Sequence, residues 1–116
     1  MAMASPQASA VSATPASAGV RQLDRDEIST LMTRAEDFMA KSDMAAARLL
    51  LQRAAEAGEA RAALALGATF DPTALQAMGV VGVAPDVAKA RIWYEKAAEY
   101  GSAEASRRLG ALGTAE

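Results

Sequence analysis

Cysteine and histidine are both absent from this sequence. The chain therefore has no thiol nucleophile, no disulfide bond and no imidazole base, and it lacks the side chains that bind soft transition metals best. A catalytic serine or threonine needs an adjacent base, and the lysines Lys41, Lys89 and Lys96 fall at turn or solvent-facing positions of the predicted helices. The sequence indicates that the protein is not an enzyme, and we expect no catalytic residue, cofactor or metal.

Aromatic residues are also scarce, at 4% of the chain, although hydrophobic residues make up 52%. The apolar content is therefore mostly alanine and leucine, which favour helix and allow helices to pack closely. A chain of 116 residues is long enough for one modest core. These proportions predict a single all-α domain.

Neither basic nor acidic residues are concentrated in one part of the chain. Lys plus Arg number 12 against 14 Asp plus Glu, and the basic residues are scattered, so the sequence lacks the basic patch that binds nucleic acid. No apolar run reaches the length of a membrane span, so we expect no membrane contact. The absence of cysteine leaves the compartment open, because such a protein suits cytoplasm and periplasm alike.

The first part of the chain differs in composition from the rest. Ala, Ser and Pro dominate residues 1–22, and Ser5 and Pro6 interrupt any apolar run that a secretory signal would need. We expect a disordered linker over residues 1–22 and a folded domain over residues 23–116.

Aspartates mark the predicted helix starts. Asp24 with Glu27 has the spacing of a capping box, Asp43 and Asp86 precede apolar helical patterns, and Asp71 precedes a proline at the first helical position. Helices are predicted over 25–40, from 44 until Gly58, over 59–70 and over 87–100, with a short insert that ends at Gly79. A last helix starts at Ser102 and is expected to fade at Gly110 to Gly113.

An internal repeat is the strongest signal in the sequence. A shift of 43 positions aligns residues 43–67 with residues 86–110, and the identities include the capping aspartates, several alanines and the glycines that end the helices. The repeated unit spans a helix pair. Small residues at matching positions let helix backbones approach closely, as stacked hairpins require.

The stretch from Ala62 to Gly101 resembles the Sel1-like, tetratricopeptide-related family, most recognisably in the run Trp93 to Gly101. Further matches are Ala62, Leu66, Gly67, Phe70, Gly82, Val83, Asp86 and Ala90. About seven extra residues, 71–78, depart from the family pattern, and the first unit is closer to a plain tetratricopeptide repeat. The resemblance covers about residues 28–112. It implies a short right-handed α-solenoid of antiparallel helix hairpins, with about five helices plus a short inserted helix.

In such a family the first helix of each pair lines an inner face that binds peptides or partner helices. The residues that the resemblance places on this face are Met32, Glu36, Met39, Arg61, Leu64, Asp71 and Arg107. Flexible methionine and leucine with separated charges suit an extended peptide or a helix. The alternative is that these are ordinary half-exposed residues, and both interpretations stay open.

The insertion carries apolar residues outside any repeat position, notably Met78, Val80 and Val81. Such side chains either pack onto the helices or contact a partner, and we expect packing. Trp93, the single tryptophan, flanks the buried stripe of its helix, which favours half-buried packing over a partner contact.

The sequence therefore predicts a protein–protein interaction module that acts as an adaptor or scaffold, existing as a monomer or a homodimer. The alternative is a structural or regulatory C-terminal domain of a larger bacterial envelope-associated protein, in which residues 1–22 end a spacer.

Overall fold

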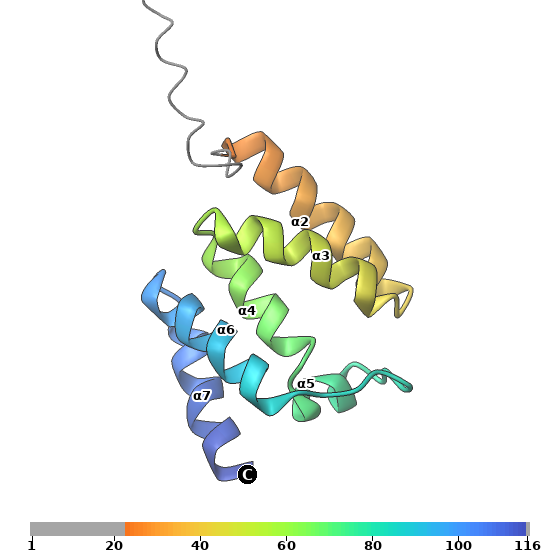
Figure 1. The fold of residues 1–116 in the computed structure, drawn as a ribbon, viewed down its shortest axis with the longest axis vertical. Coiled ribbons are helices and arrows are strands. Elements are labelled where there is room, and N and C mark those ends of the chain that lie inside the picture. The colour runs from red at the N-terminus through yellow and green to blue at the C-terminus, as the bar shows by residue number, and fades with distance from the viewer. Residues whose placement is uncertain (1–22, 116) are drawn as a thin grey trace, which may run out of the picture.

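The computed structural model of the chain describes residues 23–115, and this part is all-α, with six helices and no strand (Figure 1). The predicted all-α class is confirmed. The expected linker at residues 1–22 lies outside the described residues. The helices are α2 (Arg25–Ala40), α3 (Met44–Glu56), α4 (Ala60–Ala68), α5 (Pro72–Ala77), α6 (Val87–Glu99) and α7 (Ala103–Ala115).

Helix starts follow the predicted caps. The Asp24 carboxylate accepts a hydrogen bond from the Glu27 amide at 2.8 Å, and the Glu27 side chain accepts from the Asp24 amide at 3.0 Å, so the capping box is complete. The side chains of Asp43, Asp71 and Asp86 likewise accept from amides in the first turns of α3, α5 and α6. Each carboxylate satisfies a backbone donor that has no partner within its helix.

Glycine ends the two helices that the repeat relates. Gly58 after α3 has φ 93° and Gly101 after α6 has φ 106°, a left-handed conformation that costs glycine little. The prediction that the last helix fades at Gly110 to Gly113 is wrong, because α7 continues to Ala115. Leu112 explains the difference, since its side chain is only 3% exposed and its burial holds the final turns against the core.

Each long helix packs against the next long helix along the chain: α2 on α3, α3 on α4, α4 on α6, and α6 on α7. The core is built largely from alanines that are fully buried, with Leu51, Leu66 and Tyr94 as its large members. Gly67 of α4 faces the ring of Tyr94, and a Cβ atom placed on Gly67 would lie 2.5 Å from the ring atom Cδ1. Glycine is therefore required where α4 packs against the ring of Tyr94.

Helix α5 and the loop after it, residues 71–85 and from here on called the insertion, do not take part in this sequential packing. The loop extends away from α7 (Figure 1). The Asp86 amide donates to the Phe70 carbonyl at 2.8 Å, which closes the base of the insertion. Within residues 23–115 no helix has both the length and the apolar character of a membrane span.

Candidate functional site

One hollow on the described part of the chain has a volume of about 450 Å³. Its walls come from the C-terminal part of α2, the end of α4, the inserted helix α5 and the C-terminal half of α7. Segments far apart in sequence therefore meet here. The lining residues are Met39, Ala68, Asp71, Thr73, Ala74, Ala77, Met78, Arg108, Ala111 and Leu112.

Three of the sequence-predicted residues meet in this hollow, which we call the α5 pocket: Met39, Asp71 and Met78. Met39 and Met78 supply flexible apolar side chains from α2 and from the residue after α5. Methionine adapts to differently shaped apolar partners, so a pocket bounded by two methionines and several alanines suits an apolar side chain.

The other predicted residues lie outside the α5 pocket. Met32 is 6% exposed and belongs to the core, and Leu64 is partly buried against the same core. Glu36 and Arg61 are exposed, and Arg61 donates to Glu59 at 2.8 Å. This hydrogen bond and the electrostatic attraction of Glu59 raise the pKa of Arg61, and attraction by Glu36 adds a smaller effect. These charges lie on the surface of α2 and α4, where a pair contributes little to stability.

Arg107 was predicted to line the inner face, but its neighbour Arg108 lines the α5 pocket. Both arginines bond the same carboxylate: Arg107 donates to Oε1 of Glu104, and Arg108 donates from Nε to Oε2 at 3.1 Å. The two hydrogen bonds lower the pKa of Glu104. The guanidinium carbon of Arg108 also lies 5.9 Å from the ring centroid of Tyr94.

Asp71, which lines the pocket, is held by two hydrogen bonds. The Tyr94 hydroxyl donates to Oδ2 of Asp71 at 2.7 Å, and Oδ1 of Asp71 accepts from the Thr73 amide at 2.9 Å. Burial and the hydrogen bond to Asp71 raise the pKa of Tyr94. Because Asp71 is 6% exposed and both its carboxylate oxygens accept hydrogen bonds, it fixes α5 against α6.

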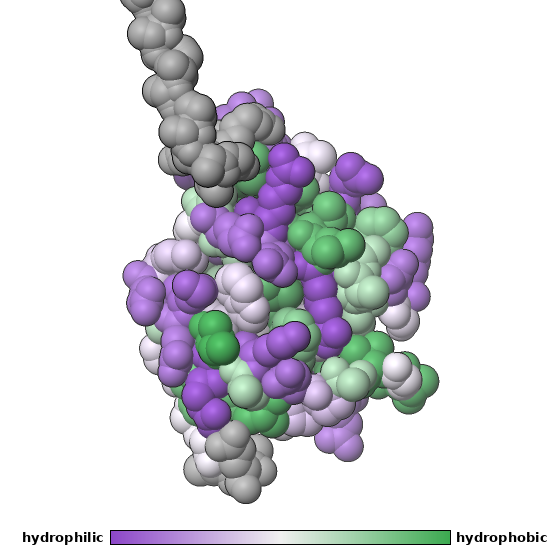
Figure 2. Space-filling model, in the orientation of Figure 1, coloured by the Kyte–Doolittle hydropathy of each residue, from purple (hydrophilic) through white to green (hydrophobic). Residues whose placement is uncertain are grey.

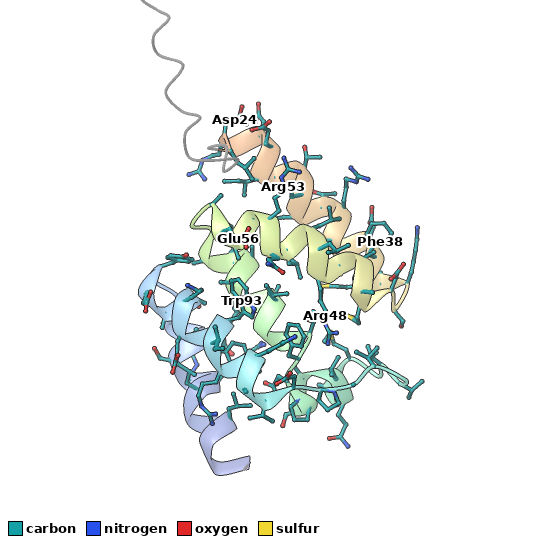
Figure 3. All side chains as sticks on the ribbon, in the orientation of Figure 1. Asp24, Phe38, Arg48, Arg53, Glu56 and Trp93 are labelled. Carbon is teal, nitrogen blue, oxygen red and sulfur yellow. The ribbon has the colours of Figure 1, made fainter. Side chains whose placement is uncertain are left out.

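Arg48 joins α3 to both ends of the insertion, a role that the sequence did not reveal. Its Nε donates to Oγ1 of Thr69 at 3.1 Å, and its Nη2 donates to the Thr69 carbonyl and, at 3.4 Å, to the Ala84 carbonyl. The guanidinium carbon lies 3.9 Å from the Phe70 ring centroid. Figure 3 shows Arg48 extending from α3 toward the chain after α4. The only sequence signal for this role was the repeat match between Arg48 and Arg91.

The insertion leaves two large apolar side chains in solvent. Val81 is 89% exposed and Met78 is 40% exposed, whereas Val80 is half-buried. The expectation that these residues pack onto the helices is wrong for Val81. In Figure 2 hydrophobic surface gathers over the loop that follows α5. Trp93 packs half-buried against the core, as predicted, with Lys96 Nζ 6.0 Å from its ring centroid.

Another hollow, of about 320 Å³, lies between the start of α2 and Arg53 of α3. Acidic and hydroxyl side chains of α2 supply much of its lining. Over residues 23–115, no three side chains among Asp, Glu, His and Cys come together in a way that could hold a metal ion. The α5 pocket is the better candidate site because it is larger and is lined by residues from four helices and the residues beside them.

Comparison of the chain with protein-family models, with curated proteins and with solved structures finds no match. The fold and the pocket therefore define an all-helical protein with an apolar pocket where α2, α4, α5 and α7 meet.

Proposed function

We propose that the chain is a protein-interaction module, a short right-handed stack of Sel1-like helix hairpins that binds a partner's peptide or helix in the α5 pocket. The carrying observation is that the C-terminal ends of α2 and α4 and the C-terminal half of α7, together with α5, meet around one apolar hollow. Repeat proteins bind partners along such a face because each hairpin contributes side chains to it.

Burial at matching positions supports the repeat. Three alanines of the first unit and the three alanines 43 positions later are all fully buried, and Leu51 and Tyr94 are large core residues at equivalent positions. The pairs are Ala47 and Ala90, Ala54 and Ala97, and Ala62 and Ala105. Two helix pairs that bury the same positions and share a left-handed glycine between their helices are expected of two copies of one structural unit.

The pocket has the chemistry of a peptide site. Small alanines and two methionines leave room for an apolar anchor side chain. The Asp71 carboxylate is already hydrogen-bonded twice, so it serves mainly to position α5. These features favour a binding module over a catalytic role.

The test is capture of partners from native lysate by the full chain and by two double variants. Ala77→Arg with Ala111→Arg places long side chains in the pocket from two exposed positions, so the core is untouched. The matched control, Ala45→Arg with Ala88→Arg, alters exposed alanines of α3 and α6. Circular dichroism checks that both variants retain their helix content.

We expect one protein to be captured by the wild type and by the control variant but not by the pocket variant. Direct titration of that protein, once purified, then measures its affinity for each chain. Equal capture by all three chains would show that the α5 pocket is not the binding surface.

A further inference from the structure

The insertion carries the longest uncharged stretch of the described residues. Residues 72–85 contain no charged side chain, although 22% of the whole chain is charged. Val81 at its tip is 89% exposed. Removing apolar surface from water is favourable, so an exposed valine on an uncharged loop gains by contact with an apolar surface.

The tip is held away from the pocket of its own chain. The Asp86–Phe70 hydrogen bond closes the base, and Arg48 bonds the carbonyls of Thr69 and Ala84 on the two sides of it. Figure 1 shows the loop directed away from α7, which forms one wall of the α5 pocket. The contacts at the base favour this direction of the loop over one that covers the wall formed by α7.

The pocket suits an uncharged, apolar occupant. Of its two charged residues, Asp71 accepts hydrogen bonds at both oxygens, and Arg108 bonds Glu104. Both charged residues already have a hydrogen-bond partner, so a charged ligand would compete with these contacts while it loses its own hydration. The remaining lining is alanine, methionine, leucine and one threonine.

We propose that the protein forms a two-fold symmetric homodimer in which the Val80–Val81 tip of each copy occupies the α5 pocket of the other. This rests on the proposed function of the pocket as a binding surface and names its occupant in the free protein. Tip and pocket both adjoin α5, since Met78 lines the pocket and lies three residues from Val81. A single two-fold axis beside α5 satisfies both contacts, and such reciprocal interfaces close at the dimer.

The first test is sedimentation velocity of the full chain from low micromolar to near-millimolar concentration. The wild type is expected to pass from monomer to dimer, and Val81→Asp and Ala77→Arg to weaken the dimer about tenfold or more. Leu49→Asp is the matched control, because Leu49 is a 73% exposed apolar residue of α3 outside both the tip and the pocket. All three positions are exposed, so the variants retain the fold.

The second test uses the absence of cysteine. Val81→Cys and Ala77→Cys are made in separate chains of different mass, mixed, and oxidised under mild conditions. The dimer predicts a mixed disulfide between the two chains, and a Leu49→Cys chain mixed with Ala77→Cys serves as the control for random collision.

A wild type that stays monomeric at every concentration overturns the dimer, as does equal loss of dimer in Leu49→Asp or a mixed disulfide no more abundant than in the control. None of these results affects the proposed function, which depends on capture of a different protein. Conversely, a dimer with no pocket-dependent partner would leave self-association as the use of the pocket.

Discussion

Gly67→Ala is expected to destabilise the protein strongly, because the added Cβ would lie 2.5 Å from Cδ1 and 2.7 Å from Cε1 of Tyr94. The ring cannot move aside easily. It is fully buried, and its hydroxyl donates to the buried Asp71 carboxylate at 2.7 Å. To admit one methyl group, either the ring shifts and weakens this hydrogen bond, or α4 and α6 separate.

The magnitude follows from three effects. Overpacking a core typically costs about 1–3 kcal/mol. Weakening a hydrogen bond to a buried carboxylate costs about 1–3 kcal/mol more. Alanine recovers roughly 0.5–1 kcal/mol in a helix interior relative to glycine. The expected net loss in the free energy of unfolding is about 3 kcal/mol, a large fraction of the stability of a small domain.

Urea unfolding followed by circular dichroism measures this difference, and Gly110→Ala is the matched control. Gly110 is the repeat equivalent of Gly67 and also lies within a helix, but nothing lies within 4 Å of a Cβ placed on it. Gly110→Ala should therefore stabilise the protein by roughly 0.5–1 kcal/mol. If Gly67→Ala matches the wild type, or if both alanine variants shift in the same direction, the close approach of α4 to Tyr94 does not govern stability.

Three further predictions concern the buried polar groups and the last helix. Tyr94→Phe should lower the free energy of unfolding by about 1–3 kcal/mol, because it leaves an oxygen of the buried Asp71 without its donor. Burial raises the pKa of Tyr94 in the folded protein above the value of about 10 for tyrosine in the unfolded chain. The stability that neutral Tyr94 contributes is therefore complete below about pH 10. Above this pH the free energy of unfolding falls by about 1.4 kcal/mol per pH unit. This slope should be smaller in Tyr94→Phe, and identical slopes for both chains would contradict the assignment. Arg48→Lys should loosen the base of the insertion, because an ammonium group cannot reproduce the bonds to Thr69 and Ala84 together with the contact to Phe70. Hydrogen exchange should then become faster at the amides of Val80 and Asp86 and change little in α2. Leu112→Ala should lower the free energy of unfolding by about 2–4 kcal/mol, measured by thermal unfolding. A change near zero would mean that the end of α7 does not pack on the core.

Local sequence signals predicted the helices well, because each boundary depends on residues close together in the chain. Asp24 with Glu27, and Gly58 and Gly101, act through backbone groups a few positions away. The exception was the end of α7, where Gly110 and Gly113 suggested a stop. Their weak helix preference is outweighed by burial of Leu112, which sequence position alone does not report.

The candidate site was predicted in part. Met39, Asp71 and Met78 were selected from the sequence and lie together in the α5 pocket, whereas Arg107 was chosen in place of Arg108. Adjacent residues on a helix point about 100° apart, so a one-residue error in the register of α7 exchanges a pocket residue for a surface one. The resemblance predicts Met32 on the inner face, but its side chain is buried in the core, where α2 packs on α3.

The sequence by itself determined the all-α class, the positions of the capped helices and the repeat of 43 residues, since these depend on composition, short-range hydrogen bonds and periodicity. Only the tertiary structure decided which residues distant in sequence contact one another. These contacts are Tyr94 with Asp71, Arg48 with Thr69 and Ala84, and the helix ends around the α5 pocket. Such contacts join residues 21 or more positions apart. They are set by the packing of whole helices, which no local pattern of residues specifies.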